Sequence, residues 1–161
     1  MIISIIFGYW QRLLGAGMKR IIVMSIKPKF GYRILKGRKK FELRKHCNQD
    51  RIRTGDMIFL YFSYPVRAIL CMFRAGRVYE GTRDELRSIA EKFRNNGLGD
   101  EDWTYLDAKK PGMMIEVRSP VRIRRITLER LREGFGFEPP VSYRILKPDE
   151  PLYKYLARRI H

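Results

Sequence analysis

The order of apolar and polar positions divides the chain into short strands and helices. Three runs rich in apolar and β-branched residues, 19–26, 57–63 and 66–80, predict buried strands. Residues 39–45 alternate instead, with Phe41 and Leu43 on one side and charged residues on the other. That pattern predicts a half-buried strand with a charged outer face. The stretch 113–126 predicts one or two further strands.

Turn and capping residues place helices between these strands. Pro28 at a first helical position and Gly37 just past the end bracket a short helix. Its buried side is expected to consist of Phe30, Ile34 and Leu35.

Further helices are expected later in the chain. Thr82 and Glu85 form a capping box for a helix that continues through Phe93 and ends at Gly97. Thr127 caps a short helix, and Pro148 opens a last amphipathic helix. The polar segment 98–110 predicts a short helix and loop, in which Trp103 and Tyr105 are expected to be core or loop anchors.

Elements in this order, with mostly short connections, predict a small α+β domain whose strands curl into a barrel. The 161 residues suit one domain, which we place at 18–161. Residues 1–17 form an N-terminal extension with two interpretations: an amphipathic helix, or a segment before the true start at Met18. Its uncharged stretch ends at Arg12, too short for a membrane span. We therefore expect no membrane association.

The net charge of the chain narrows the classes of binding partner that we expect. The formal net charge is +17, with Arg more frequent than Lys. Such an excess predicts attraction to a polyanion, first nucleic acid and second an anionic membrane surface. A surface of the thermophile type explains many charges, but not a twofold excess of one sign.

Cysteine and histidine are too few to suggest a metal site or a disulfide scaffold. The chain has two of each and no CxxC spacing. We expect no metal, no cofactor and a cytoplasmic location.

The segment GRKKFELR, residues 37–44, concentrates the candidate chemistry. Glu42 and Arg44 share one strand face, close enough for an ion pair that orients the arginine. Strict alternation puts Lys39 on the opposite face, so it meets Glu42 only if the strand begins after it, which Gly37 permits. A structural surface ion pair is the alternative to a ligand site.

The same segment resembles the G-x-K-x-x-E-x-R signature of the ASCH domain, a member of the PUA-like superfamily. The matching residues are Gly37, Lys39, Glu42 and Arg44. The preceding SIKPKFGYRILKG, the later GDMIFLYFSYPVRAI and PGMMIEV, and the ending PPVSYRIL also resemble this family. The resemblance covers roughly residues 20–146.

This resemblance implies a PUA-like mixed β-barrel with flanking short helices, and RNA binding in a cleft between the barrel and the first helix. Some relatives cleave RNA or hydrolyse the amide of N4-acetylcytidine with a Lys, a Thr and a Glu. Lys39 matches their Lys, but Glu42 stands at the position of their Thr, and no motif locates their Glu.

We therefore expect an RNA-binding protein that uses a basic cleft between the barrel and the first helix to bind single-stranded or structured RNA, with no obligate protein partner evident. Lys27, Ser63 and Tyr64 are candidates to line the cleft, and the Arg-rich strand to follow phosphates. The candidate RNA contacts are Lys27, Lys39, Glu42, Arg44, Ser63, Tyr64, Arg118, Arg122 and Arg124. The alternative is an enzyme, a ribonuclease or amidohydrolase, with Lys39 and Glu42 as its reactive pair.

Overall fold

The structure is a computed structural model that describes residues 19–46 and 50–160. Six strands form one mixed sheet in the order β2-β5-β4-β3-β1-β6, in which β1 and β3 are parallel. The strands are β1 (Ile21–Ile26), β2 (Phe41–Lys45), β3 (Met57–Phe62), β4 (Ala68–Gly81), β5 (Gly112–Thr127) and β6 (Tyr143–Ile145). The helices are α2 (Pro28–Leu35), α3 (Arg83–Ala90), α4 (Asp100–Thr104), α5 (Leu128–Phe135) and α6 (Pro151–Ala157).

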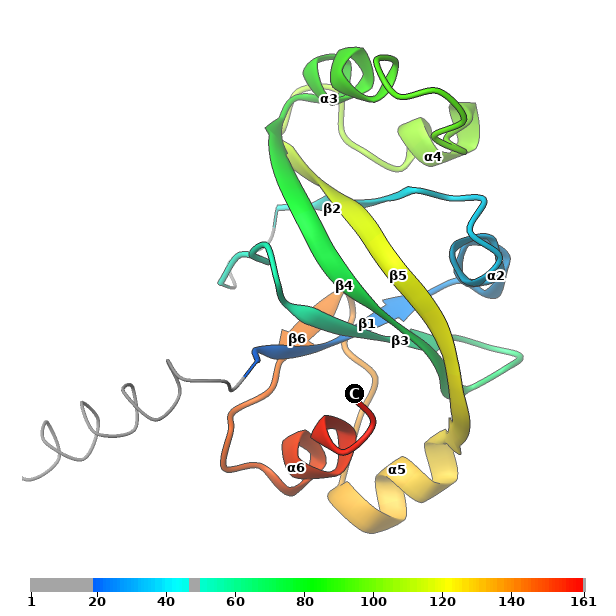
Figure 1. The fold of residues 1–161 in the computed structure, drawn as a ribbon, viewed down its shortest axis with the longest axis vertical. Coiled ribbons are helices and arrows are strands. Elements are labelled where there is room, and N and C mark those ends of the chain that lie inside the picture. The colour runs from blue at the N-terminus through cyan, green and yellow to red at the C-terminus, as the bar shows by residue number, and fades with distance from the viewer. Residues whose placement is uncertain (1–18, 47–49, 161) are drawn as a thin grey trace, which may run out of the picture.

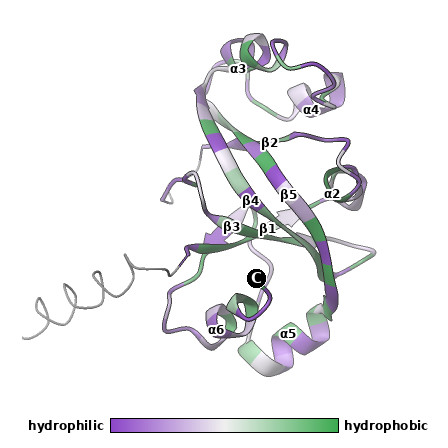
Figure 2. Ribbon diagram, viewed as in Figure 1, coloured by the Kyte–Doolittle hydropathy of each residue, from purple (hydrophilic) through white to green (hydrophobic). Residues whose placement is uncertain are grey.

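The sheet is strongly curled, and its two long strands β4 and β5 cross the front of the molecule (Figure 1). Helices α3 and α4 lie at one end of these strands, and α5 and α6 lie at the other. Hydrophobic and hydrophilic positions follow each other along both strands (Figure 2). The expected α+β arrangement of a curled mixed sheet with short helices is confirmed.

The central strands are apolar throughout because both of their faces are covered. In β1, Ile22 and Met24 belong to the cluster inside the curl, while Ile21 and Val23 belong to a second cluster. The second cluster includes Leu131 of α5 and Leu152 and Leu156 of α6. Burial on both faces explains why this strand lacks polar alternation.

A third cluster joins β2 and β5 to the outer helices. Phe41 and Leu43 pack here with Leu86 of α3 and Trp103 of α4. Trp103 is thus a core residue, as expected. This packing holds α4 against β2, which places α4 side chains beside the charged residues of that strand.

The capping signals are confirmed where they are local. Gly37 adopts a left-handed φ of 71° just past α2. Thr82 accepts a hydrogen bond from the backbone N–H of Glu85, and Thr127 accepts one from that of Arg130.

The expected end of α3 is wrong. The helix ends at Ala90 because Asn95 and Gly97 have positive φ values of 55° and 75° and reverse the chain. The Asn96 side chain also donates to the Ala90 carbonyl oxygen at 2.8 Å, which closes the last turn.

The last helix also begins later than expected, at Pro151. Glu150 accepts a hydrogen bond from the Lys147 N–H and pairs with Arg144, so residues around Pro148 form a turn. The short strand β6 was not expected, and it pairs antiparallel with β1.

The N-terminal extension 1–17, Met18 and Cys47 lie outside the described residues. Within 19–46 and 50–160, no helix has the length and apolar character of a membrane span.

Cys71 of β4 is expected to be unreactive in the folded protein. Burial raises the pKa of its thiol to about 12. A pH of 8 is four units below that pKa, so only about one molecule in ten thousand carries the reactive thiolate. In a Cys47→Ser background, Ellman's reagent should label no thiol in buffer and one thiol in denaturant. Rapid labelling without denaturant would contradict the buried position.

Candidate functional site

A pocket of about 360 Å³ lies between α2 and the inner side of the curled sheet. It is lined from β1, β2 and β3, from the start of α2, from α4 and its following residue, and from the loop before β6. The lining residues are Ser25, Ile26, Lys27, Phe30, Lys39, Glu42, Leu43, Arg44, Tyr61, Ser63, Asp102, Tyr105, Pro139, Pro140 and Val141. The position beside the first helix is the one that the family resemblance implied.

Lys39 and Glu42 meet in this pocket. Strand β2 begins at Phe41, so Lys39 is free of strand alternation and turns toward the Glu42 side. Its Nζ lies 2.8 Å from Glu42 Oε2. The condition set by the sequence, a strand that begins after Lys39, is therefore fulfilled.

Arg44 links β2, the strand at one edge of the sheet, to β1. Its Nε lies 3.3 Å from Glu42 Oε1, and its Nη2 donates to the Ser25 carbonyl oxygen of β1 at 2.7 Å. A longer bond of 3.4 Å runs from Nη1 to the Ser142 carbonyl oxygen. Arg44 thus bridges β2 and β1, which are not hydrogen-bonded neighbours in the sheet.

The charged side of β2 is buried, contrary to the expected exposed outer face. Lys39, Glu42 and Arg44 are 3% to 5% exposed. The curl of the sheet and the approach of α4 exclude solvent from this side. Because desolvated charges need partners, this network is not a surface ion pair of negligible energy.

Asp102 of α4 completes the network. Its Oδ1 lies 3.6 Å from Lys39 Nζ, and its Oδ2 accepts a hydrogen bond from the Gly99 N–H at 2.9 Å. Arg33 Nη1 lies 3.4 Å from the same carboxylate, and Arg33 Nη2 donates to the Gly97 carbonyl oxygen. Lys39 is therefore held between two carboxylates from elements about sixty residues apart in the chain.

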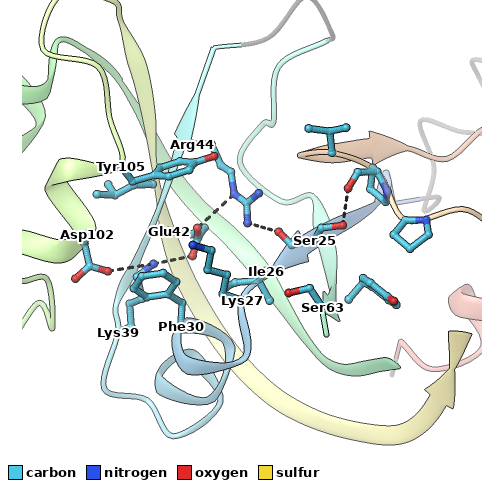
Figure 3. A pocket seen from close by; sticks show the side chains of 15 residues that line it. Ser25, Ile26, Lys27, Phe30, Lys39, Glu42, Arg44, Ser63, Asp102 and Tyr105 are labelled. Carbon is cyan, nitrogen blue, oxygen red and sulfur yellow. Dashed lines mark hydrogen bonds and ion pairs between the residues drawn. The ribbon is translucent and has the colours of Figure 1, made fainter. Parts of the chain in front are cut away.

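Aromatic rings flank this charged group. Figure 3 shows Glu42 between the rings of Tyr105 and Phe30, with Lys39 beside Phe30 and Asp102 to one side. Lys39 Nζ lies 5.1 Å from the Phe30 ring centroid, and Lys45 Nζ lies 5.1 Å from that of Tyr105. Two ring faces with fixed charges between them form a site suited to a flat, polar ligand.

Tyr61 also contributes to the lining, while its ring packs against Phe137 in the second hydrophobic cluster. Burial raises the pKa of this phenol above its ordinary value of 10.0, so it stays protonated at neutral pH.

The structure brings together five of the nine predicted contacts: Lys27, Lys39, Glu42, Arg44 and Ser63. Tyr64 follows Ser63 but does not line the pocket. Its side chain is 73% exposed.

Arg118, Arg122 and Arg124 also lie outside the pocket. All three are exposed as expected, but neighbouring residues are exposed too, so the strand does not alternate regularly. Strand β5 is bulged against β4 on either side of Val121 and Arg122, and Ser119 has a φ of 50°. Bulges interrupt the period of two, so consecutive residues reach the surface here. Arg118 pairs with Glu116 at 2.8 Å on the same strand.

Sequence reasoning missed Phe30, Asp102 and Tyr105 as site residues. Phe30 was expected in the core, and Tyr105 was expected to be an anchor. The local signal for Asp102 is its place in the first turn of α4, where it caps the Gly99 N–H. Nothing local indicates that this turn packs against β2.

The pocket has little net charge. Its lining contains three cations, Lys27, Lys39 and Arg44, and two carboxylates, Glu42 and Asp102. The chain's net charge of +17 therefore lies mostly on other surfaces. In the described part of the chain, no group of three or more His, Cys, Asp or Glu side chains is arranged to hold a metal ion.

Comparison with solved structures identifies the fold. The ASCH protein from Zymomonas mobilis superposes with a TM-score of 0.71 at 22% identity, covering 84% of this chain and 94% of that one. A mutant of the same protein gives a TM-score of 0.73 at 22% identity, covering 87% and 96% of the two chains. At this identity the likeness concerns the fold, and the expected ASCH-type fold is confirmed.

Two more distant structures share the architecture. The N-terminal domain of Staphylothermus marinus McrB gives a TM-score of 0.58 at 12% identity, covering 89% of this chain and 96% of that one. The N-terminal domain of Thermococcus gammatolerans McrB, bound to m5C DNA, gives 0.53 at 10% identity, covering 89% and 100%. No protein-family model and no curated protein matches the sequence.

Proposed function

We propose that this chain, which has the fold of the ASCH domain, binds RNA and takes one unpaired base into the pocket beside α2. The observation that carries the proposal is the placement of a buried Lys39–Glu42 pair among the rings of Phe30 and Tyr105. A flat base can contact an aromatic face while its polar edge meets the ammonium and the carboxylate. A pocket of about 360 Å³ is in the range of small-molecule sites.

Two observations support nucleic acid as the ligand. The chain carries a net charge of +17, which favours a polyanion. A protein with the same architecture, the Thermococcus McrB domain, has been solved bound to m5C DNA. We propose RNA because sequence-specific RNA recognition uses unstacked bases of single-stranded segments, which a pocket of this kind accepts without melting a duplex.

Tyr105→Ala is expected to weaken RNA binding about 5- to 150-fold, because a base stacked on an aromatic ring contributes about 1–3 kcal/mol. The measurement is fluorescence anisotropy of a labelled single-stranded RNA at several salt concentrations. Phe93→Ala is the matched control, since Phe93 is an aromatic residue of similar exposure, 41% against 45% for Tyr105, that does not line the pocket. Absence of binding at low salt, or equal effects of the two substitutions, would contradict the proposal.

A hydrolytic enzyme is the second candidate, favoured by the contact of Lys39 with both Glu42 and Asp102. A lysine between two carboxylates places a proton donor and proton acceptors in one pocket. The RNA from the binding experiment can be analysed on a denaturing gel, and N4-acetylcytidine can be tested beside it. Turnover that disappears in Lys39→Ala supports catalysis, and its absence in the wild type leaves binding alone.

A further inference from the structure

A group of four arginines outside the pocket has no acidic partner. Arg67 lies in the turn between β3 and β4, and Arg122, Arg124 and Arg125 lie on β5. None of the four forms an ion pair within the described part of the chain. The pocket lining is nearly neutral, so these four arginines are a separate concentration of positive charge on the surface.

The turn between β3 and β4 begins at the pocket. Ser63 lines the pocket, and its N–H donates to the Ile26 carbonyl oxygen at 2.9 Å. The next residue, Tyr64, presents its ring to solvent, and the Arg67 guanidinium lies 5.1 Å from the ring centroid. An exposed aromatic ring with an arginine on it is a surface on which a nucleobase can stack.

The far side of the turn is fixed to β5. Arg125 Nη2 donates to the Val66 carbonyl oxygen at 2.9 Å, and the Leu128 N–H donates to that of Arg67 at 2.9 Å. These bonds hold Arg67 at a φ of 49°, a left-handed conformation that is uncommon outside glycine. Tyr64, Arg67 and Arg125 are therefore held together by one ordered turn, and Arg122 and Arg124 precede Arg125 on the same strand.

Strand β5 is open along this stretch. Its partner β2 pairs only with residues 112–116, so residues 118–125 have β4 on one side and no strand on the other. The side chains of Arg122 and Arg124 are exposed there, and in the described part of the chain neither guanidinium makes a hydrogen bond or an ion pair, although the backbone of Arg122 pairs with Cys71 of β4. Charges on an edge strand prevent aggregation, which explains their presence on β5 but not the exposed Tyr64–Arg67 stack.

We propose that Tyr64, Arg67, Arg122, Arg124 and Arg125 form a second RNA-binding surface, here called the turn surface, which holds the nucleotides next to the base in the pocket. This inference rests on the proposed function. A neighbouring base stacks on Tyr64, and the phosphates that follow contact the arginines along the open edge of β5. The ligand is accordingly a strand of several nucleotides and not a free nucleotide.

The test compares salt dependence for a labelled 15-nucleotide single-stranded RNA. The Arg122→Ala/Arg124→Ala double variant should bind about tenfold more weakly at low salt, and its slope of log affinity against log salt should fall by about 1.4, since each phosphate contact on a single strand contributes about 0.7. Tyr64→Ala should lower affinity about 5- to 150-fold with little change in slope. The control is Lys109→Ala/Lys110→Ala, which removes the same charge from an exposed loop elsewhere.

The outcomes separate the turn surface from the pocket. The turn surface is overturned if the salt slope of the arginine variant is unchanged, or if the lysine control shows the same decrease. In either case the Tyr105→Ala measurement still tests the pocket independently. A decreased slope with no effect of Tyr105→Ala supports the turn surface and rejects the base pocket. If the arginine variant loses binding to phosphatidylserine vesicles but keeps the wild-type slope on RNA, the surface is a membrane contact and the assignment to RNA is overturned.

Discussion

Replacing Gly97 with alanine is expected to lower the free energy of unfolding by about 2–5 kcal/mol and to displace α4 from the pocket. Gly97 has a φ of 75°, and a Cβ at this position would overlap the Arg38 carbonyl group, lying 2.7 Å from its carbon and 3.0 Å from Lys39 Cα. The left-handed conformation costs about 1–2 kcal/mol for a non-glycine residue, and overpacking adds about 1–3 kcal/mol.

Because of the position of Gly97, the same substitution is expected to affect the pocket as well as stability. Its carbonyl oxygen accepts from Arg33, and two residues later Gly99 begins the turn that carries Asp102. A backbone shift at Gly97 therefore separates Asp102 from Lys39. RNA affinity is expected to fall together with stability, because Tyr105 follows on the same segment.

Gly37→Ala is the matched control for Gly97→Ala. Gly37 also has a positive φ, 71°, but nothing lies within 4 Å of its Cβ position. This variant should lose only the conformational cost of about 1–2 kcal/mol. Urea unfolding followed by circular dichroism measures both. Equal losses would show that the backbone of residues 38–39 does not restrict Gly97.

Glu42→Ala is expected to destabilise the protein by about 3–5 kcal/mol, because it leaves two buried cations without their common partner. Lys39 would retain the 3.6 Å contact with Asp102 and its contact with the Phe30 ring, and among the described residues Arg44 would retain backbone carbonyl oxygens as its partners. Urea unfolding gives the loss directly.

A double-mutant cycle tests whether the loss comes from the stranded lysine. Lys39→Met removes the charge while keeping an unbranched side chain of similar length. In the Glu42→Ala background, Lys39→Met should therefore cost much less than it does in the wild type, with a coupling energy of about 0.5–3 kcal/mol. Additive effects within about 0.5 kcal/mol would show that the Lys39–Glu42 contact contributes little.

Prediction from the sequence succeeded where the cause is local. Pro28 and Gly37 fix the ends of α2 through their own backbone preferences, and Thr82 with Glu85 caps α3 within one turn. The Lys39–Glu42 contact belongs to this class, because it depends only on the residue at which β2 begins.

Prediction failed where distant segments decide the outcome. The end of α3 depends on a reversal several residues later, and β6 exists because β1 offers a free edge. A regular alternation of exposed arginines was expected along β5, but the register against β4 bulges and interrupts it. Bulges arise from the fit between two strands, and the pattern of a single strand does not reveal them.

The sequence by itself determined the order of the strands before β6 and most helices, the ASCH-type motif, the excess of positive charge and the pairing of Glu42 with Arg44. Those features follow from backbone preferences and side-chain spacing over a few residues. Only the tertiary structure decided that this segment is buried, since burial requires the curl of the sheet and the packing of α4. It also brought Asp102 and Tyr105 to Lys39 and placed Tyr64 and the β5 arginines outside the pocket, because contacts between distant segments depend on how three hydrophobic clusters pack.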